Sequence, residues 1–333
     1  MPDDETYFTV KRAVLGLFSI ALALVAASCG GGGSSAAGTT YSSVAMAGEL
    51  IDYTIDTTAL TYSYTITESQ FGLTGTTGSG TLVRNGDGSY SPSGVPNARV
   101  VVLPNGLLLS AVRERFGSAA VTVPIIGLSN PVTTVDAIAG NYNYIHRNCL
   151  LSVCGADHGT FQIAAGGTWT SCAGDDIADG MCSGTSASGT LEPLGNGRWR
   201  VMDGSTNIGT ALGFASAGQN VILLDLKDVR PGGFGVGMLV GGQQVTMTTA
   251  QTDGTWIAGT SAGHWGVFTA SGSTITLNLL DGVPVSIPTT FTANAPWTGM
   301  ATTGAGGVGF LAGAGVYVLE TASGGAELGI KLR

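Results

Sequence analysis

The sequence predicts an all-β protein built from antiparallel strands, with few or no helices beyond its N-terminal segment. Three observations support this prediction. After Ser35, apolar and polar residues alternate at every second position, as they do on a half-buried strand. Glycine makes up 54 of the 333 residues, and Asn-Gly and Asp-Gly pairs recur as turn signals. Only 11% of the residues are charged, so the surface must consist largely of Ser, Thr, Asn and Gly.

An N-terminal antiparallel β-domain is expected over residues 41–127. Apolar residues alternate in segments 51–55 and 60–66, on either side of an Asp-Thr-Thr turn, which predicts a hairpin with one apolar face. Asn85-Gly86 is a tight-turn signal, because both residue types tolerate positive φ. Continuous apolar runs around Pro104-Asn105-Gly106 predict a further hairpin whose strands are covered on both faces.

A larger C-terminal antiparallel β-barrel or sandwich is expected over residues 136–333, after a break in the pattern at Ser129-Asn130-Pro131. Residues 135–139 predict one short helical turn before the first strand. Short strands with tight turns then follow at regular spacing, which is typical of a sandwich or an up-and-down barrel, and closure removes open strand edges. The expected strands are 141–146, 160–164, 189–194, 198–202, 209–214, 220–226, 234–240, 244–249, 264–269, 274–279, 283–287, 297–302, 308–312, 316–320 and 327–332.

The first 28 residues have the layout of a secretory signal peptide. Lys11 and Arg12 precede an apolar run that ends at Ser28 and leads to Cys29. The run is shorter than the roughly 20 residues with which a helix crosses a bilayer. The pattern therefore indicates export rather than a permanent membrane span.

The segment Val25-Ala26-Ala27-Ser28-Cys29 resembles the bacterial lipobox, in which small residues precede a cysteine that is lipidated and becomes the new N-terminus. The resemblance implies that residues 1–28 are a lipoprotein signal peptide and that Cys29 carries a palmitate-type membrane anchor. Gly30 stands where inner-membrane lipoproteins of that class carry Asp, which implies a cell-envelope protein at the outer membrane, on its periplasmic or its outer face. Residues 29–40 then form a flexible Gly/Ser tether. The alternative is an ordinary cleaved signal peptide followed by an incidental cysteine.

Lipidation of Cys29 leaves an even set of cysteines, and an even set in an oxidising compartment indicates two disulfides. The pairs Cys149–Cys154 and Cys172–Cys182 are favoured because each closes a short loop. The nested pairs, Cys149–Cys182 with Cys154–Cys172, are the alternative, since they would join two neighbouring antiparallel strands. A zinc site of four thiolates is a third option, but Cys-x-x-Cys spacing is absent.

An acidic loop between two of these cysteines holds the candidate metal ligands. Asp175, Asp176 and Asp179 lie within residues 174–180. Carboxylate oxygens on a constrained loop are the ligands that a hard cation such as calcium prefers. The spacing does not match an EF-hand, and a solvated loop tip is the alternative.

Three further residues suggest a second metal site. His146 and His158 would come together with Asp157 if adjacent strands aligned them. No HExxH or comparable spacing is present, and isolated histidines more often have structural roles.

The segment Gly259-Thr260-Ser261-Ala262-Gly263 matches G-x-S-x-G and resembles the corresponding residues of patatin-type lipases. The resemblance implies a serine hydrolase with Ser261 as its nucleophile, on a sharp strand-to-helix turn. Residues 264–268 favour another strand instead, and the Gly-rich oxyanion loop of that family is not found. A hairpin turn is therefore the alternative.

The leading functional hypothesis is a membrane-anchored extracytoplasmic lipoprotein that acts as a non-enzymatic binding or interaction module, without a cofactor. The chain has a formal net charge of −9 and no basic cluster, which argues against nucleic acid or anionic lipid as partners. Its plan resembles the Gram-negative surface lipoproteins that pair a β-rich handle with a β-barrel. The expected partners are the membrane, through the lipid on Cys29, and a protein or a small apolar ligand.

A second hypothesis is a lipocalin-like carrier of a small apolar ligand. Gly140-Asn141-Tyr142 resembles the Gly-x-Trp of the first lipocalin strand, and Gly-Thr-Trp occurs at both 167–169 and 254–256. A hollow barrel would favour the carrier, and a filled barrel would favour the interaction module. Five tryptophans beside predicted turns are candidates for lining a barrel mouth, with core packing as the alternative: Trp169, Trp199, Trp256, Trp265 and Trp297.

Overall fold

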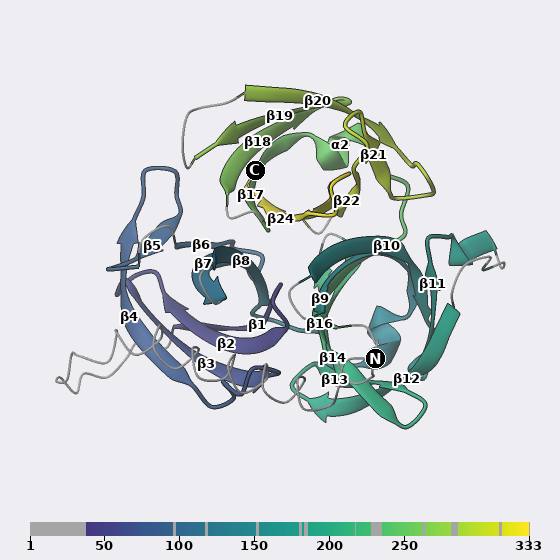
Figure 1. Ribbon diagram of the computed structural model, residues 1–333, viewed down its shortest axis with the longest axis horizontal. Helices are drawn as coiled ribbons and strands as arrows, with labels where there is room; N and C mark the ends of the chain where they lie inside the picture. The colour runs from purple at the N-terminus through teal and green to yellow at the C-terminus, as the bar shows by residue number, and fades with distance from the viewer. Residues whose placement is uncertain are drawn as a thin grey trace, which may run out of the picture.

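The protein consists of three closed β-barrels, each made of eight antiparallel strands. The structure is a computed structural model that describes residues 38–332 except 96–97, 117–118, 151–152, 180–181, 183–185, 217, 228–234, 262–263, 281–285 and 313–314. Figure 1 shows the barrels side by side around a common centre. In each barrel every strand pairs with the next one along the chain, and the last strand pairs with the first. The prediction of an all-β fold is confirmed.

The first barrel covers the region where an N-terminal β-domain was expected. The hairpins expected from segments 51–55 and 60–66 and from the runs around residues 104–106 are present as the β2–β3 and β6–β7 pairs. The strands are β1 (Thr39–Ala45), β2 (Glu49–Asp56), β3 (Thr61–Ser69), β4 (Thr77–Arg84), β5 (Tyr90–Pro92), β6 (Arg99–Val102), β7 (Leu107–Phe116) and β8 (Ala119–Leu128).

The middle barrel begins after the short 3-10 helix η3 (Val135–Ile138), at the place where one helical turn was expected. A second short 3-10 helix, η4 (Ile177–Asp179), lies in the connection between its third and fourth strands. The strands are β9 (Gly140–Leu150), β10 (Val153–Ile163), β11 (Thr168–Ala173), β12 (Ser186–Gly195), β13 (Arg198–Asp203), β14 (Thr206–Ser216), β15 (Gln219–Leu226) and β16 (Val236–Gln243).

The third barrel begins after the short helix α2 (Thr249–Thr252). Its last strand pairs with its first over five residue pairs, which closes the sheet. The strands are β17 (Gly254–Thr260), β18 (Trp265–Ser271), β19 (Thr274–Leu279), β20 (Ser286–Ala293), β21 (Ala301–Thr303), β22 (Val308–Ala312), β23 (Val316–Glu320) and β24 (Ala326–Lys331).

The structure corrects the expectation of one C-terminal barrel or sandwich over residues 136–333, because this region closes into two separate barrels. The strand expected at 244–249 is also wrong, since residues 244–248 form no strand and α2 follows. Both corrections have the same cause. Pairing of β16 with β9 completes the middle sheet at Gln243, so the next residues have no strand edge with which to pair.

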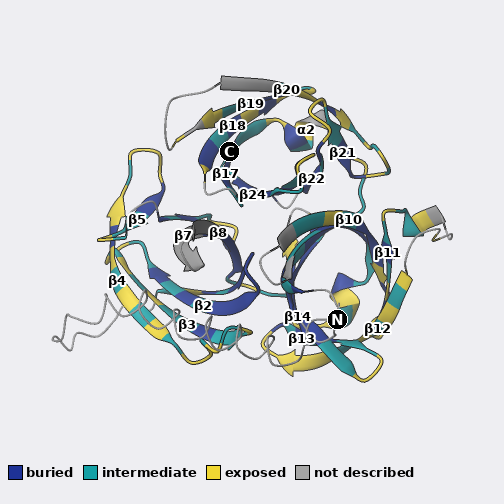
Figure 2. Cartoon of the chain, in the orientation of Figure 1, coloured by how far each residue is buried: buried dark blue, intermediate teal, exposed yellow. Residues whose placement is uncertain are grey.

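One hydrophobic core joins the three barrels. It contains Leu107 of the first barrel, Leu223 and Val240 of the middle barrel, and Leu328 of the third barrel, all almost completely buried. In Figure 2 the strands nearest the centre of the molecule are largely buried, whereas β4 and β12 on the outside are largely exposed. The interior of the middle barrel forms a second, separate cluster.

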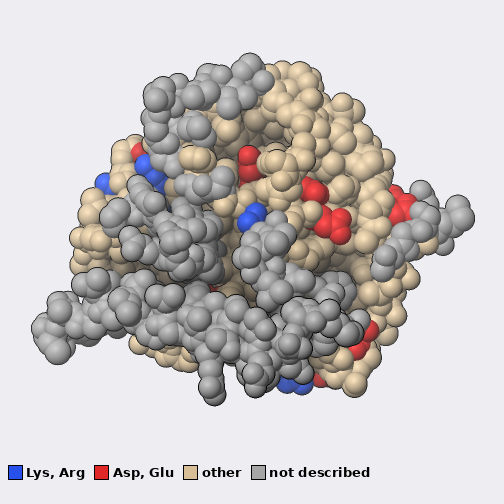
Figure 3. Space-filling model, in the orientation of Figure 1, with Lys and Arg blue, Asp and Glu red and all other residues tan. Residues whose placement is uncertain are grey.

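Polar contacts also connect the barrels across this core. Ion pairs join Arg198 to Asp52 and Lys227 to Glu68 between the middle and first barrels. His158 Nδ1 lies 2.7 Å from Glu320 Oε2 between the middle and third barrels. On the face in Figure 3 the charged side chains of the described residues are few, as the low charge content predicts, and several of them lie near the centre of the view.

Candidate functional site

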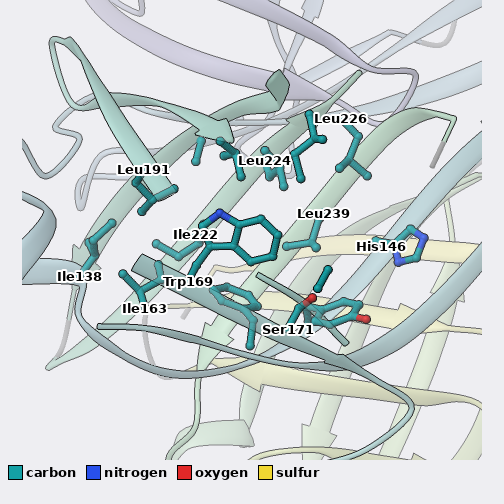
Figure 4. Close-up of a pocket in the computed structure, with 16 residues that line it drawn as sticks. Ile138, His146, Ile163, Trp169, Ser171, Leu191, Ile222, Leu224, Leu226 and Leu239 are labelled. Carbon is teal, nitrogen blue, oxygen red and sulfur yellow. The ribbon is translucent and has the colours of Figure 1, made fainter. Parts of the chain in front are cut away.

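The middle barrel encloses a cavity of about 110 Å³. Figure 4 shows its lining, with Ile138 at one end and His146 at the other. Thirteen of the sixteen lining side chains are aliphatic or are Phe and Trp, so the wall is largely apolar. The lining residues are Ile138, Tyr144, His146, Phe161, Ile163, Trp169, Ser171, Ala187, Leu191, Val201, Ile208, Ala211, Ile222, Leu224, Leu226 and Leu239.

The strand alternation separates the cavity wall from the shared core. On β15, Ile222 and Leu224 line the cavity, whereas Val221 and Leu223 between them belong to the core that joins the barrels. Successive side chains of a strand point to opposite faces, so a strand apolar at every position serves both surfaces. Such a run has no period of two, and for this reason the sequence alone did not identify the lining residues.

The helix η3 closes one end of the cavity. Its last residue, Ile138, is completely buried against the cavity. The Tyr142 hydroxyl donates a hydrogen bond to the Ile138 carbonyl at 2.5 Å, and Asn220 Nδ2 donates to the Ala137 carbonyl at 2.9 Å. Burial raises the pKa of Tyr142 to about 12, so the phenol keeps its donor proton at neutral pH. The start of β9 thus holds the plug in place.

Glycine at position 241 leaves room for the Phe161 ring, which lines the cavity. A Cβ atom at this position would lie 2.7 Å from the Phe161 ring, closer than real contacts allow. With glycine there, Phe161 lies flat against Tyr142, with ring centroids 4.8 Å apart and 5° between the planes. The two rings form a rigid wall beside the cavity.

The polar groups of the cavity gather at the end opposite the plug. They are the His146 imidazole, the Ser171 hydroxyl and the Tyr144 phenol, on β9 and β11. Burial lowers the pKa of His146, which favours the neutral ring at neutral pH. Burial, together with the charge of Asp157, raises the pKa of Tyr144, which keeps the phenol protonated. No Lys, Arg, Asp or Glu is among the lining residues.

The third barrel has nearly no comparable space. Its interior hollow measures about 10 Å³, roughly the room that one water molecule needs. Trp256, Phe268 and Tyr317 fill it, with ring centroids 4.8 Å apart for Phe268–Tyr317 and 5.8 Å for Trp256–Phe268. The cavity is therefore a property of the middle barrel and not a general consequence of closing eight strands.

The acidic loop uses its carboxylates locally. Asp175 Oδ1 accepts a hydrogen bond from the Asp176 backbone N–H, and Asp176 Oδ1 accepts from the Ala178 N–H and from Gln244 Nε2. The side chain of Asp179 lies outside the described residues. Among the described residues no group of three His, Cys, Asp or Glu side chains is placed to hold a metal ion. A cation site at this loop stays a prediction.

The two histidines expected to share a metal site lie on opposite faces of the barrel wall. His146 lines the cavity, whereas His158 contacts Glu320 of the third barrel. In the β9–β10 register, His146 faces Asp157 and His158 faces Ile145. Because side chains alternate between the two faces of the sheet, the His146 and His158 rings point away from each other. The spacing of the two residues in the sequence does not show this, because it does not give the register of the two strands.

A disulfide joins Cys172 of β11 to Cys182 in the following connection, with a Cα–Cα distance of 5.7 Å. This is one of the two favoured pairs, and it excludes the nested alternative. The backbone register places Cys149 of β9 directly opposite Cys154 of β10. The side chains of both lie outside the described residues, so their bridge stays a prediction.

Ser261 does not lie on a nucleophile elbow. It follows β17, and the next element is the strand β18 rather than a helix. Its Oγ accepts a hydrogen bond from the Ala326 backbone N–H at 3.0 Å, and its own N–H donates to the Ala326 carbonyl. Ala262 and Gly263 lie outside the described residues. The described geometry is that of a hairpin turn tied to β24.

The five tryptophans divide mainly between core and cavity. Trp169 lines the cavity and donates its Nε1–H to the Met202 carbonyl at 3.2 Å, while Trp199 is buried in the same barrel. Trp256 and Trp265 are buried in the third barrel, and Trp297 donates to Asn143 Oδ1 of the middle barrel at 2.7 Å. One of the five candidates therefore faces a space that a ligand can occupy.

The signal peptide, the tether up to residue 37 and Cys29 lie outside the described residues. Within the part of the chain that the structure describes, no helix has the length and apolar character needed to cross a membrane.

Comparison with known proteins does not assign this chain to a family. No family model matches the sequence, and no curated protein matches it. Among solved structures, the chain is similar to a Trp-176-Ala mutant of transferrin binding protein B from Haemophilus parasuis, with 11% sequence identity. The similarity covers 85% of this chain and 65% of that chain, so this chain spans just under two thirds of that protein. It is also similar to a DUF3598-family protein of unknown function from Nostoc punctiforme, with 10% identity over 88% of this chain and 94% of that one. The TM-scores are 0.21 and 0.20, too low to carry an argument about this protein.

Proposed function

We propose that this protein is a non-enzymatic extracytoplasmic binding protein that carries one small apolar molecule inside its middle barrel. The observation that supports this proposal is the closed eight-stranded barrel around an apolar cavity of about 110 Å³. Small-molecule sites are typically concave and mostly apolar, with few polar groups. The cavity favours the carrier over a purely structural barrel, which would be filled with side chains like the third barrel.

Burial of the ligand's apolar surface supplies the binding free energy. Removing apolar surface from water contributes roughly 25 cal/mol per Å². The lining is held in place by a closed sheet and by the η3 plug, so little ordering is needed when a guest binds. Preorganisation of this kind preserves most of the gain from burial.

The membrane anchor is part of the same proposal and rests on the sequence pattern before Cys29. A lipidated Cys29 and the Gly/Ser tether hold the barrels at the outer membrane of the cell envelope. Mass spectrometry of the mature protein is expected to find an N-terminal diacylglyceryl or triacylated cysteine, and Cys29→Ser is expected to abolish the lipid. An unmodified mature N-terminus at any residue contradicts the anchor.

The carrier role is tested by binding of apolar probes to the purified protein. Titration calorimetry with toluene, p-xylene and naphthalene is expected to give saturable binding with one site for at least one probe. A ligand at about 100 times its Kd raises the free energy of unfolding by about 2.7 kcal/mol. A measurable rise in Tm is therefore expected under the same conditions.

A matched pair of variants locates the site. Ala211 lines the cavity and is 3% exposed, whereas Ala215, on the same strand β14, is exposed. Ala211→Leu places three more carbon atoms in the cavity and is expected to abolish binding, and Ala215→Leu is expected to leave it unchanged. Equal probe binding by Ala211→Leu and the parent protein contradicts the proposed site.

A further inference from the structure

The chemistry of the cavity narrows the class of molecule that it accepts. The polar atoms of the lining lie near the end opposite Ile138, and Figure 4 shows His146 and Ser171 apart from the aliphatic side chains around Ile138, Ile163 and Leu191. The cavity therefore has an apolar part and one hydrogen-bonding end. A guest that fits both parts carries a single polar group.

The described residues of the hydrogen-bonding end are neutral groups. Asn148 Nδ2 lies 3.1 Å from His146 Nε2, so the amide is a hydrogen-bond partner of one ring nitrogen of the neutral imidazole. Ser171 contributes a hydroxyl that can donate or accept, and Tyr144 contributes a protonated phenol. These groups complement an oxygen of an alcohol, a phenol or a carbonyl.

The described lining residues offer a charged guest no counter-ion. A buried carboxylate or ammonium group without a paired opposite charge is strongly disfavoured. Among the described residues no basic side chain lines the cavity, and the acidic groups that act on His146, Asp157 and Glu320, lie outside the lining. Their negative charge further opposes an anion, and neither contacts the cavity to pair with a cation.

We propose that the ligand is an uncharged molecule with one hydrogen-bonding oxygen, which lies at the His146–Ser171 end while its apolar body extends towards Ile138. This inference rests on the proposed carrier function and deepens it. It assigns Ser171 and His146 as the residues that select the ligand, and it distinguishes the site from one for fatty acids or other apolar anions.

Four probes of nearly the same size test the inference at pH 7. They are p-cresol, its isostere p-xylene, the 4-methylbenzoate anion and the 4-methylbenzylammonium cation. Titration calorimetry is expected to show that p-cresol binds at least as tightly as p-xylene, although p-cresol is better hydrated in water. It is also expected to show that p-cresol binds about a hundredfold more tightly than either ion. Ser171→Ala is expected to weaken p-cresol binding three- to tenfold and to leave p-xylene binding unchanged.

Control variants separate the possible outcomes. Ser188→Ala removes an exposed hydroxyl of β12 on the outward face and is expected to change neither affinity. His146→Leu is the second selective variant and is expected to favour p-xylene over p-cresol. Binding of p-xylene without discrimination, or tightest binding of the anion or the cation, overturns this inference but leaves the carrier function standing. Failure of all four probes overturns both.

Discussion

The middle and third barrels begin in the same way and yet differ inside. The first strand of each barrel comes after a short helix and begins with a glycine at positive φ, 153° for Gly140 and 141° for Gly254. Two residues later, Tyr142 donates to the Ile138 carbonyl and Trp256 donates to the Thr252 carbonyl, in each case four residues back. The same local device therefore starts a hollow barrel and a filled one.

The interiors differ at two sets of equivalent positions. Tyr144 pairs with Gly241, which pairs with Ile222; in the third barrel Ala258 pairs with Gly329, which pairs with Tyr317. Ile222 thus stands where the third barrel has a ring. In the same register, Leu239 of the middle barrel is equivalent to Glu327 of the third barrel. Glu327 Oε2 accepts a hydrogen bond from the Tyr317 hydroxyl at 2.9 Å. The middle barrel in turn has Tyr144 where the third barrel has Ala258, so the position of the rings, and not only their presence, differs between the two interiors.

Removing that ring should have the largest effect. Tyr317→Ile is expected to lower the free energy of unfolding by about 3–5 kcal/mol, because it leaves a cavity beside Phe268 and a half-buried Glu327 carboxyl without its donor. Urea unfolding measures the loss. The double variant Tyr317→Ile with Glu327→Leu is expected to regain part of it and to bind p-xylene in the third barrel. A loss below about 1 kcal/mol for the single variant contradicts the comparison.

Adding an aromatic ring is expected to have a smaller effect on stability in the middle barrel than in the third barrel. Ile222→Phe fills space in the hollow barrel and is expected to change stability by under about 1 kcal/mol while displacing p-xylene. Leu311→Phe, beside the small hollow of the third barrel, is expected to cost about 1–3 kcal/mol by overpacking. Thermal unfolding of both variants checks the contrast, and equal costs would count against it.

A smaller effect is expected from loosening the plug. Tyr142→Phe removes the hydrogen bond to Ile138 and is expected to cost about 1 kcal/mol. The amide hydrogen of Ala139, which bonds to the Asp136 carbonyl, should then exchange faster with solvent. Hydrogen exchange followed by mass spectrometry measures this. Trp256→Phe, the matched change in the third barrel, is expected to leave the Ala139 amide unchanged.

The smallest effect concerns the contact between the two barrels. The hydrogen bond to Glu320 is the main reason why the pKa of His158 is raised above 6.5. A raised pKa means that the pair stabilises the fold fully below pH 6.5 and that this contribution is lost as pH rises through the folded-state pKa. His158→Gln is therefore expected to cost about 1 kcal/mol or less at pH 6 and less still at pH 9, since the pair is partly exposed. Thermal unfolding across this range, with Glu320→Gln as the matched variant, should show the same trend.

The all-β fold was predictable because alternation and turn signals are local. The number of barrels was not, because the connection at residues 244–249 alternates polar and apolar residues as a strand does. A usable signal did exist at residues 140–142 and 254–256, where a glycine precedes an aromatic residue by two. Gly-Thr-Trp at 167–169 is the closer sequence match to 254–256, but it opens the third strand of its barrel rather than the first.

The cavity was predictable only as a hypothesis. Whether a closed barrel is hollow depends on the size of the inward side chains, such as Ile222 in the middle barrel and Tyr317 at the equivalent position of the third barrel. Strand pairing brings such side chains together from distant parts of the sequence. Trp169 was a candidate because of its place beside a turn, and it does line the cavity. His146 was a candidate for metal binding, and its place at the hydrogen-bonding end follows from the strand face that it occupies.

The core shared by the three barrels has a consequence for how fast a guest is exchanged. A closed sheet can part most simply at the seam between its first and last strands, here β9 and β16. The outward side chains of that seam, Ile145, Met238 and Val240, are buried in the shared core. Parting the seam would break the packing that holds the three barrels together. A guest is therefore expected to exchange through an end of the barrel and not by parting of the sheet.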